Sequence, residues 1–376
     1  MTNTAEDDGG HRRSPGRLAL GRVPALGGVL LAAALLAGCA PALQPMGDRV
    51  VQPTVAADSF RTADGLSLPL RAWLPPQGSP RAVILALHGF NDYANTFTEA
   101  GAFWADAGIA TYAYDQRGFG ATAPEKRGIW PGAATMRADL FDAARAVAER
   151  HPGVPLYLLG HSMGGAVVLT AVVAHGLPPG VDGAILVAPA VWSRETMPLY
   201  QRVALAIGSW TVPWMAMTAP EGIRRYASDN IEMLRAMGRD PLVIKETRID
   251  AIWGLTNLMD EAMDAATRLS PRRLGGPVLL LYGDKEDILP AAPVNQALAA
   301  LPAGADGPRV AIYPQGWHML LRDLQAQTVW RDVLAWIDDP AAPLPSGADR
   351  RDRRIPVRNG RPDLPPESLP RAAGPG

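Results

Sequence analysis

One pentapeptide, Gly160-His161-Ser162-Met163-Gly164, constrains the fold of this chain more than any other feature. It follows an apolar run, Pro155 to Leu159, that predicts a buried strand, and it precedes a small apolar stretch, 165–175, that predicts a helix. A strand, a G-x-S-x-G turn and a helix make a nucleophile elbow, whose tight turn exposes the serine hydroxyl. We therefore expect Ser162 to be a nucleophile at the carboxyl end of a strand.

Composition excludes several classes of function. The chain has 376 residues, of which 48% are hydrophobic, and a formal net charge of −1, so nothing supplies the basic field that a nucleic-acid partner requires. A single cysteine permits neither an internal disulfide nor a cysteine-rich metal site. No His/Cys cluster has ligand spacing and no glycine-rich loop would cradle a phosphate, so we expect no metal and no cofactor.

The first residues predict a targeting segment. Four arginines precede an apolar stretch, 23–37, that is shorter than the roughly 20 residues of a membrane-spanning helix. Residues 1–38 are therefore expected to be a signal peptide. The only cysteine, Cys39, follows Leu-Ala-Gly, and this stretch resembles a bacterial lipobox, which implies cleavage before Cys39 and lipid attachment there. An ordinary signal peptide with an incidental cysteine, or an uncleaved anchor, is the alternative.

This resemblance implies a place in the cell. A lipidated Cys39 would bind the protein to a membrane of the bacterial envelope. Because Ala40, and no acidic residue, follows the cysteine, we expect the outer membrane, with the protein facing the periplasm.

The remaining chain divides into a linker, a folded body and a tail. Residues 39–55 contain proline and glycine without a period and predict a linker, and the body is expected over 56–339. Residues 340–376 are rich in Pro, Arg, Asp and Gly and have few large apolar side chains. We expect this tail to be disordered, because it cannot bury enough surface to offset its ordering entropy.

Within the body, apolar strand patterns alternate with helical ones. Strands are predicted at 66–73, 81–88, 109–115, 155–160, 185–188, 277–282 and 310–314, and helices at 133–151 and 323–337. This alternation predicts an α/β fold with a mostly parallel sheet and helices on both faces. In such sheets the reactive groups gather at the carboxyl ends of the strands.

One stretch, about 191–268, interrupts the alternation. It contains six aromatic residues and seven of the twelve methionines, with no convincing strand. We interpret it as a helical insertion that caps the site. Most of these side chains are expected to form the insertion's own core, but a lining partly made of adaptable methionine would suit acyl chains.

A serine nucleophile requires a base, and the base requires an orienting carboxylate, which in this architecture follows in the order Ser, acid, His. The acid should follow the strand 277–282, where Asp284, Glu286 and Asp287 compete. A carboxylate three residues after the glycine, with Pro290 four residues further, favours Glu286. Asp287 is the alternative, and Asp284 is expected to be a turn residue.

The base and the oxyanion donors come from three other loops. His318 lies in a loop just past the strand 310–314, which is where the base should fall, whereas His175 ends the helix after the elbow. An oxyanion hole requires two N–H groups. We expect them from Met163, directly after the nucleophile, and from Phe90, which follows the strand ending at His88.

Four ordered motifs carry a family resemblance. His88-Gly89-Phe90, Asp115-x-Arg117-Gly118-x-Gly120, the elbow extended to Gly165, and His318-Met319-Leu320-Leu321 together resemble the α/β-hydrolase superfamily. The elbow is similar to that of the monoacylglycerol lipase and lysophospholipase group, and the resemblance covers about residues 56–339. It implies a helical cap and a Ser-His-acid site. Glu286 departs from the group, which usually has Asp there, so the loop must shift to fit the longer side chain.

The expected function is a serine carboxylester hydrolase that acts on monoacylglycerol, lysophospholipid or similar single-chain esters through an acyl-enzyme. A prolyl-aminopeptidase-type peptidase is the first alternative, and it requires an acidic cluster in the cap to bind the substrate amine. The candidates are Glu221, Glu232, Asp260, Glu261 and Asp264. The second alternative is a non-catalytic envelope lipoprotein that uses the fold for binding.

Overall fold

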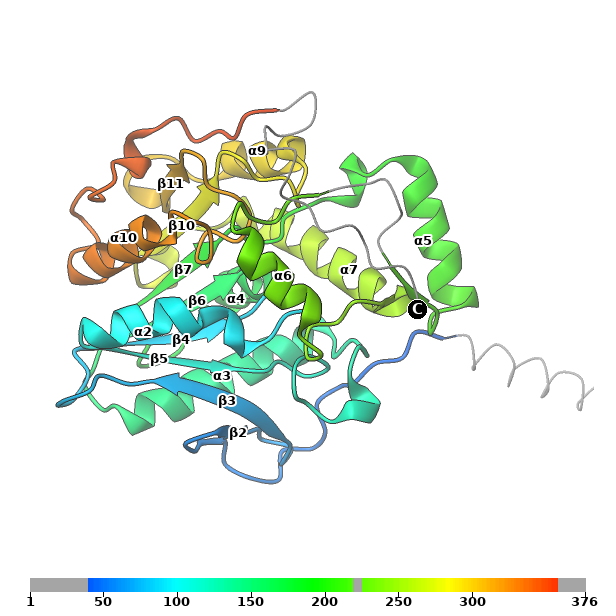
Figure 1. The fold of residues 1–376 in the computed structure, drawn as a ribbon, viewed down its shortest axis with the longest axis horizontal. Helices are drawn as coiled ribbons and strands as arrows, with labels where there is room; N and C mark the ends of the chain where they lie inside the picture. The colour runs from blue at the N-terminus through cyan, green and yellow to red at the C-terminus, as the bar shows by residue number, and fades with distance from the viewer. Residues whose placement is uncertain (1–39, 219–224, 358–376) are drawn as a thin grey trace, which may run out of the picture. The chain divides into compact units, whose positions relative to one another are not determined.

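A computed structural model describes residues 40–218 and 225–357. The predicted signal peptide and Cys39 lie outside the described residues. The centre of the molecule is a nine-stranded sheet with the order β1-β2-β3-β5-β4-β6-β7-β10-β11 (Figure 1). Strand β6 (Leu156–His161), which leads into the elbow, lies near the middle of this sheet. The elbow serine is therefore supported by strands on both sides.

Six strands run parallel, and the three strands at one edge pair antiparallel. The parallel strands are β4 (Ala82–Leu87), β5 (Ile109–Tyr114), β6, β7 (Gly183–Val187), β10 (Val278–Gly283) and β11 (Arg309–Tyr313). The edge consists of β1 (Thr54–Val55), β2 (Ser59–Arg61) and β3 (Ser67–Trp73). Every residue of β4, β5, β6, β7 and β10 is buried, as strands covered on both faces require. The prediction of a mostly parallel α/β sheet is confirmed.

Helices cover both faces. On one face, α2 (Thr98–Asp106) and α10 (Ala326–Asp338) bury Trp104, Val329 and Trp336 against the sheet. On the other face lie α3 (Ala133–Arg150), α4 (Met163–His175), α7 (Ile249–Ala266), α8 (Pro271–Leu274) and α9 (Ala291–Ala300). Single turns of helix are η1 (Ala94–Phe97), η2 (Pro124–Lys126), η3 (Arg194–Thr196), η4 (Gly304–Asp306) and η5 (Ala348–Arg350). The α-helices on the two faces each contribute apolar side chains to one of two buried cores.

The insertion between β7 and α7 differs from the prediction in two ways. It contains α5 (Leu199–Thr211) and α6 (Ile231–Arg239), but also two short strands, β8 (Ala216–Met217) and β9 (Thr247–Arg248), that pair antiparallel. The predicted insertion also extended over α7. The structure instead packs α7 in the main core, with Leu258 and Ala262 fully buried, because its small apolar face fits against α4. The insertion therefore ends at residue 248.

Both ends of the body are longer than the sequence predicted. In the segment interpreted as a linker, the Arg49 guanidinium forms two hydrogen bonds of 2.9 Å with the Asp142 carboxylate of α3. In the segment expected to be disordered, Leu344, Ala348 and Ile355 are each 1% exposed. These few apolar and charged side chains contact residues that are far away in the sequence. Local composition does not predict such contacts. Residues 358–376 of the predicted tail lie outside the described residues.

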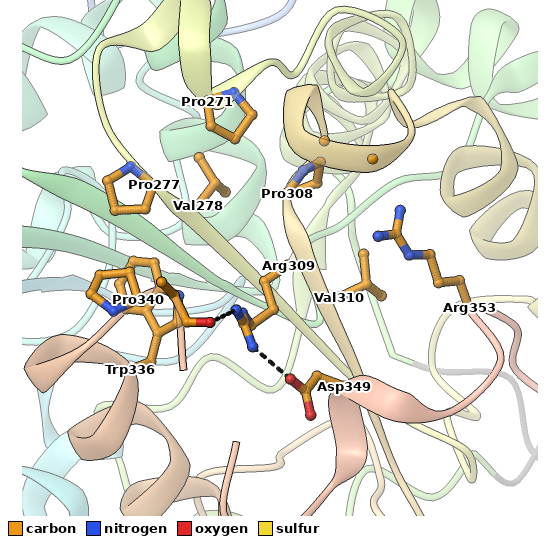
Figure 2. Close-up of a pocket in the computed structure, with 13 residues that line it drawn as sticks. Pro271, Pro277, Val278, Pro308, Arg309, Val310, Trp336, Pro340, Asp349 and Arg353 are labelled. Atoms are coloured by element: carbon orange, nitrogen blue, oxygen red, sulfur yellow. Dashed lines mark hydrogen bonds and ion pairs between the residues drawn. The ribbon is translucent and has the colours of Figure 1, made fainter. Parts of the chain in front are cut away.

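The segment after α10 also packs at the amino ends of β10 and β11. Arg309, the first residue of β11, donates to the Asp349 carboxylate at 2.7 Å and to the Ala341 carbonyl at 2.8 Å (Figure 2). A cleft of about 550 Å³ lies there, walled by prolines, Trp336 and Arg353. Within the described part of the chain, its lining includes no serine, cysteine or histidine. The elbow lies at the opposite ends of the strands, the carboxyl ends.

Candidate functional site

The turn at Ser162 is as tight as the motif predicts. Ser162 connects β6 to α4 with φ 52° and ψ −115°, a conformation that side-chain-bearing residues rarely adopt. A Cβ on Gly160 would lie 2.4 Å from the Gly164 carbonyl oxygen, and a Cβ on Gly164 would lie 2.3 Å from that of Leu87. Only glycine fits at either position, so the sequence fixes the strained turn that presents the hydroxyl.

The structure brings Ser162, His318 and Glu286 together. The Ser162 Oγ lies 2.9 Å from His318 Nε2, and His318 Nδ1 lies 2.7 Å from Glu286 Oε2. His318 follows β11 and Glu286 follows β10, as the order of strands predicts. The second oxygen of Glu286 accepts from the Ile288 and Leu289 N–H groups at 2.8 and 2.9 Å. The carboxylate is thus fixed at both oxygens, and it can orient the imidazole toward the serine.

A close approach of two glycines joins the loops that carry Glu286 and His318. A Cβ on Gly283 would lie 2.1 Å from the Gly316 carbonyl oxygen. The Lys285 N–H donates to the same carbonyl at 2.8 Å, and the Glu286 N–H donates to the Gly283 carbonyl at 3.3 Å. This tight turn brings the two loops close enough for the Glu286 carboxylate to reach His318.

The other two carboxylates of this loop point elsewhere. Asp287 Oδ2 accepts from the Tyr226 N–H at 2.9 Å, and Asp287 Oδ1 forms an ion pair with Arg225 at 3.1 Å. Asp284 lies in the turn after β10, where it accepts from the Gln315 N–H of the neighbouring loop at 2.8 Å. The structure therefore places Glu286, and neither neighbour, against the imidazole.

The two expected oxyanion donors lie in the turns next to Ser162. Met163 is the first residue of α4, so its N–H has no acceptor within the helix. Phe90 follows Gly89, whose Cβ position lies 3.3 Å from the Ser162 Cβ, so this turn packs directly against the nucleophile. The Phe90 ring packs against Phe119, with centroids 5.7 Å apart. Both turns are held by buried packing.

Ser162 and His318 open into an apolar cavity of about 320 Å³. Its apolar walls come from the body and from the insertion. They are Phe90, Ala190, Trp192, Ala227, Met237, Leu255, Met259, Ile288, Leu289 and Met319. Methionines line it only in part, and several aromatics of the insertion, including Trp210 and Trp214, are exposed outside it. The cavity can accept an apolar chain next to the serine.

One acidic residue that no sequence motif indicates, Asp92, also lines the cavity. It is 5% exposed, and burial raises the pKa of its carboxyl group. It lies two residues after Phe90, and this position was the only available signal. A carboxyl group with a raised pKa can donate or accept a hydrogen bond inside the cavity.

Two histidines beside the site are structural. His88 is fully buried, and its Nε2 accepts from the Gln116 N–H at 2.9 Å. The His161 ring lies 3.1 Å from the His318 carbonyl oxygen through Nε2, and burial lowers its pKa to about 3. At neutral pH His161 is therefore uncharged and donates to the backbone of the loop that carries His318.

The loop that contains Arg117 is an electrostatic brace. Arg117 binds the Asp64 and Asp139 carboxylates at 2.7 and 2.6 Å, and all three side chains are largely buried. The Arg117 guanidinium holds the pKa of Asp64 below its usual range, whereas burial raises the pKa of Asp139 to about 6. This network connects the residues after β5 to α3, so it supports the fold without contacting Ser162.

The acidic residues that a peptidase would require in the cap are paired with arginines. The described pairs are Glu232 with Arg235, Asp260 with Arg194, Glu261 with Arg137 and Asp264 with Arg268. Among the described residues, none of these acids lines the cavity, and Glu221 lies outside the described residues. No cluster of three possible metal-ligating side chains occurs in residues 40–218 and 225–357.

The sequence is similar to that of several known proteins. The family described as "Hydrolase_4: Serine aminopeptidase, S33" matches residues 78–325. A monoacylglycerol lipase of Mycolicibacterium smegmatis is 26% identical over 77% of this chain and 99% of its own length. The mouse monoglyceride lipase is 25% identical over 76% of this chain and 91% of its own length.

A solved structure is similar as well. The soluble variant of the Saccharomyces cerevisiae monoglyceride lipase, solved with a substrate analogue, superposes with a TM-score of 0.63 at 19% identity. The match covers 79% of this chain and 98% of that one. This likeness concerns the fold, including the parallel sheet and its covering helices.

Proposed function

This chain belongs to the family described as Hydrolase_4, serine aminopeptidase S33. We propose that it hydrolyses monoacylglycerol, lysophospholipid or a similar single-chain ester. It is a serine hydrolase with the α/β-hydrolase fold, and its monoacylglycerol lipase relatives support an esterase or lipase activity. The finer substrate assignment is supported by one observation. The Ser162 hydroxyl, in reach of His318, opens into an apolar cavity.

The mechanism follows from the contacts at Ser162. His318 Nε2 accepts the hydroxyl proton while Ser162 Oγ attacks the ester carbonyl carbon, and Glu286 stabilises the imidazolium that forms. The N–H groups of Phe90 and Met163 donate to the negative oxygen of the tetrahedral intermediate. The imidazolium then protonates the leaving alcohol, which departs and leaves an ester between Ser162 and the acyl group.

Hydrolysis of the acyl-enzyme reuses the same groups. His318 accepts a proton from water, the resulting hydroxide attacks the acyl carbon, and the proton returns to Ser162 Oγ as the fatty acid leaves. The apolar walls, including Trp192 and Met259, hold the acyl chain away from bulk water during both steps.

The proposal is tested with the full-length protein in detergent and a chain-length series of monoacylglycerols and lysophospholipids. We expect release of free fatty acid by the wild type and loss of release in Ser162→Ala. A fluorophosphonate probe should label the wild type only. If the wild type binds the probe but hydrolyses none of these lipids, the site is an active serine hydrolase and the substrate assignment is wrong.

An aminopeptidase activity is the second candidate, because the family carries that description. The ion pairs Glu232–Arg235 and Asp260–Arg194 disfavour it, since these carboxylates are already neutralised outside the cavity. Proline anilide and medium-chain p-nitrophenyl esters, compared at equal concentration, separate the two activities. Faster turnover of the anilide would favour the peptidase.

We further propose that the protein is held at a bacterial envelope membrane through lipidated Cys39. The support comes from the start of the described chain. The Ala42 N–H donates to Asp250 Oδ2 at 3.1 Å, and the Asp250 N–H donates to the Pro213 carbonyl at 3.1 Å. Ala42 therefore lies beside the start of α7 and the turn that follows α5.

The surface at that point is strongly apolar. On α5, Tyr200, Ile207 and Trp210 are 71%, 59% and 62% exposed, and Trp214, next to Pro213, is 52% exposed. Exposed apolar groups of this size, grouped on one helix and the turn after it, suit a lipid surface. Among the described residues, no helix combines the length and the apolar character that crossing a bilayer requires.

If the membrane proposal is right, the wild type incorporates labelled palmitate. Cys39→Ala should incorporate none and should be released from the membrane fraction. Trp210→Ser combined with Ile207→Ser should weaken binding of detergent-free Cys39→Ala protein to anionic vesicles. A dimer that dissociates in this double variant would instead identify a second copy as the occupant of the apolar surface.

A further inference from the structure

One short segment of the insertion, Arg225–Asn230, contacts both loops that carry the acid and the base. We call it the bridging segment. Toward the acid loop, its Tyr226 N–H donates to Asp287 Oδ2 at 2.9 Å, and Arg225 pairs with Asp287 Oδ1 at 3.1 Å. Asp287 is the direct neighbour of Glu286. The segment is therefore attached one residue away from the carboxylate that orients His318.

The same segment is attached to the loop that carries His318. The Met319 N–H donates to the Ala227 carbonyl at 2.9 Å, and the Asn230 side chain donates to the Arg322 carbonyl at 3.0 Å. Met319 directly follows His318. The bridging segment thus pairs with the backbone on the carboxyl side of the imidazole.

A buried carboxylate, Asp323, completes this attachment. Its Oδ1 accepts from the Ser228 hydroxyl at 2.6 Å, and its Oδ2 accepts from the Trp317 N–H at 2.7 Å. Ser228 is fully buried and Asp323 is 4% exposed, so water does not replace either bond. One carboxylate therefore ties the insertion to the backbone on the amino side of His318.

Packing supports the same arrangement. The Tyr226 ring lies edge-on to the Trp317 indole, with centroids 6.1 Å apart, and both side chains are buried. Burial raises the pKa of Asp323 to about 7, against the opposing effect of its bonds with Ser228 and Trp317. The chain thus keeps a costly buried carboxyl group where an apolar side chain would make neither bond.

From these contacts we infer that Asp287 and Asp323 are positioning residues, which use the bridging segment to fix His318 against Ser162 and Glu286. The inference rests on the proposed role of His318 as the base. A displacement of about 1 Å at a reacting group can cost about 100-fold in rate, so a loop fixed on two sides has a direct effect on turnover. The insertion thereby acts on the relay as well as on the cavity wall.

The test distinguishes the hydrogen bond accepted by Asp287 from the charge of Asp287, and both from an effect on folding. Asp287→Asn retains an oxygen that accepts from Tyr226, so its kcat should stay within about twofold of the wild type. Asp287→Ala and Ser228→Ala each remove one attachment and should lower kcat about 3- to 10-fold with little change in KM. The double variant releases both attachments, so its loss should exceed the product of the two single losses.

The rate of fluorophosphonate labelling at Ser162 is measured in parallel. It reports the Ser162–His318 geometry without depending on the ester substrate, so it decides the inference even if the wild type hydrolyses none of the lipids tested. Arg235→Ala is the matched control, because Arg235 lies on α6 and, among the described residues, its ion pair is with Glu232 at the surface. It should leave kcat and labelling unchanged.

Three results would overturn the inference. Unchanged kcat and labelling in the double variant, with a lower melting temperature, would make the attachments purely structural. A raised KM with unchanged kcat would assign them to the cavity wall. A loss in Asp287→Asn as large as in Asp287→Ala, with full activity in Arg225→Ala, would mean that the charge of Asp287 acts on the relay directly and not through the bridging segment.

Discussion

Glu286 and Asp287 are adjacent in sequence, yet their carboxylates face different partners. Glu286 Oε2 lies 2.7 Å from His318 Nδ1, whereas Asp287 Oδ2 accepts from the Tyr226 N–H at 2.9 Å. The first carboxylate orients the imidazole, and the second holds the insertion in place. Two adjacent acids of one loop thus do different work, which makes them a matched pair for mutagenesis.

The first prediction uses that pair. Glu286→Gln should lower kcat by about 10³- to 10⁴-fold, because an amide cannot stabilise the imidazolium and can favour the wrong tautomer. Asp287→Asn should stay within about twofold of the wild type, because its amide oxygen can still accept from the Tyr226 N–H. Steady-state kinetics with a p-nitrophenyl ester measure both. If the two effects are exchanged, Asp287 is the acid.

The second prediction concerns the backbone strain at Ser162. Its φ of 52° with ψ of −115° is unfavourable for any residue that has a Cβ, so Ser162→Ala keeps the strain and Ser162→Gly removes it. Both variants lack the nucleophile. We expect Ser162→Gly to be more stable than Ser162→Ala by about 1 kcal/mol in chemical denaturation. Equal stabilities would show that the turn stores no strain.

The third prediction is a pH dependence of stability that originates at His161. Burial lowers the pKa of His161 from 6.5 to about 3, so the unfolded chain binds a proton below pH 6.5 that the folded protein does not bind. Stability is therefore complete above pH 6.5 and decreases as the pH falls toward 3. This linkage should cost about 2 kcal/mol between pH 7 and pH 5.

His161→Gln removes this titration and keeps a side-chain donor for the His318 carbonyl. Its free energy of unfolding should therefore vary less with pH over that window than that of the wild type. The measurement is urea denaturation at half-unit pH steps. Parallel curves for the two proteins would contradict the assignment.

The fourth prediction compares two glycines. Gly283→Ala would place a Cβ 2.1 Å from the Gly316 carbonyl oxygen and should separate the acid loop from the base loop, with loss of activity and a lower melting temperature. At Gly238, in the last turn of α6, no atom of the described residues beyond its own turn of helix lies within 4 Å of the Cβ position. Gly238→Ala should raise stability by about 0.5 kcal/mol and keep activity. A fully active Gly283→Ala would contradict the close approach.

Much of this site could be predicted from the sequence because its parts are local. The elbow is defined by glycines two positions from Ser162, and His318 and Glu286 each follow an apolar strand whose carboxyl end points to the same edge of the sheet. The burial of Asp92 in the cavity could not be predicted, since only the folded chain brings the insertion over it.

The remaining differences depend on contacts between residues far apart in the chain. The Ser228–Asp323 hydrogen bond spans 95 positions, and no periodicity marks it. The same reason applies to Ile355, which is buried although an arginine-rich run, 350–354, directly precedes it. The β1 and β2 strands, with two and three residues, are too short to produce a pattern.

The insertion leaves the sheet from β7, which lies between the strand of the nucleophile and the strands of the acid and base. Its sequence can therefore be exchanged without cutting any strand of the nine-stranded sheet, and a chimera with the cap of another esterase is a practical route to a new chain-length preference. Such a graft should retain residues 225–230. A donor cap that lacks the serine that donates to Asp323 and the backbone N–H that donates to Asp287 would still supply a new cavity wall. Such a cap would not fix the position of the His318 imidazole.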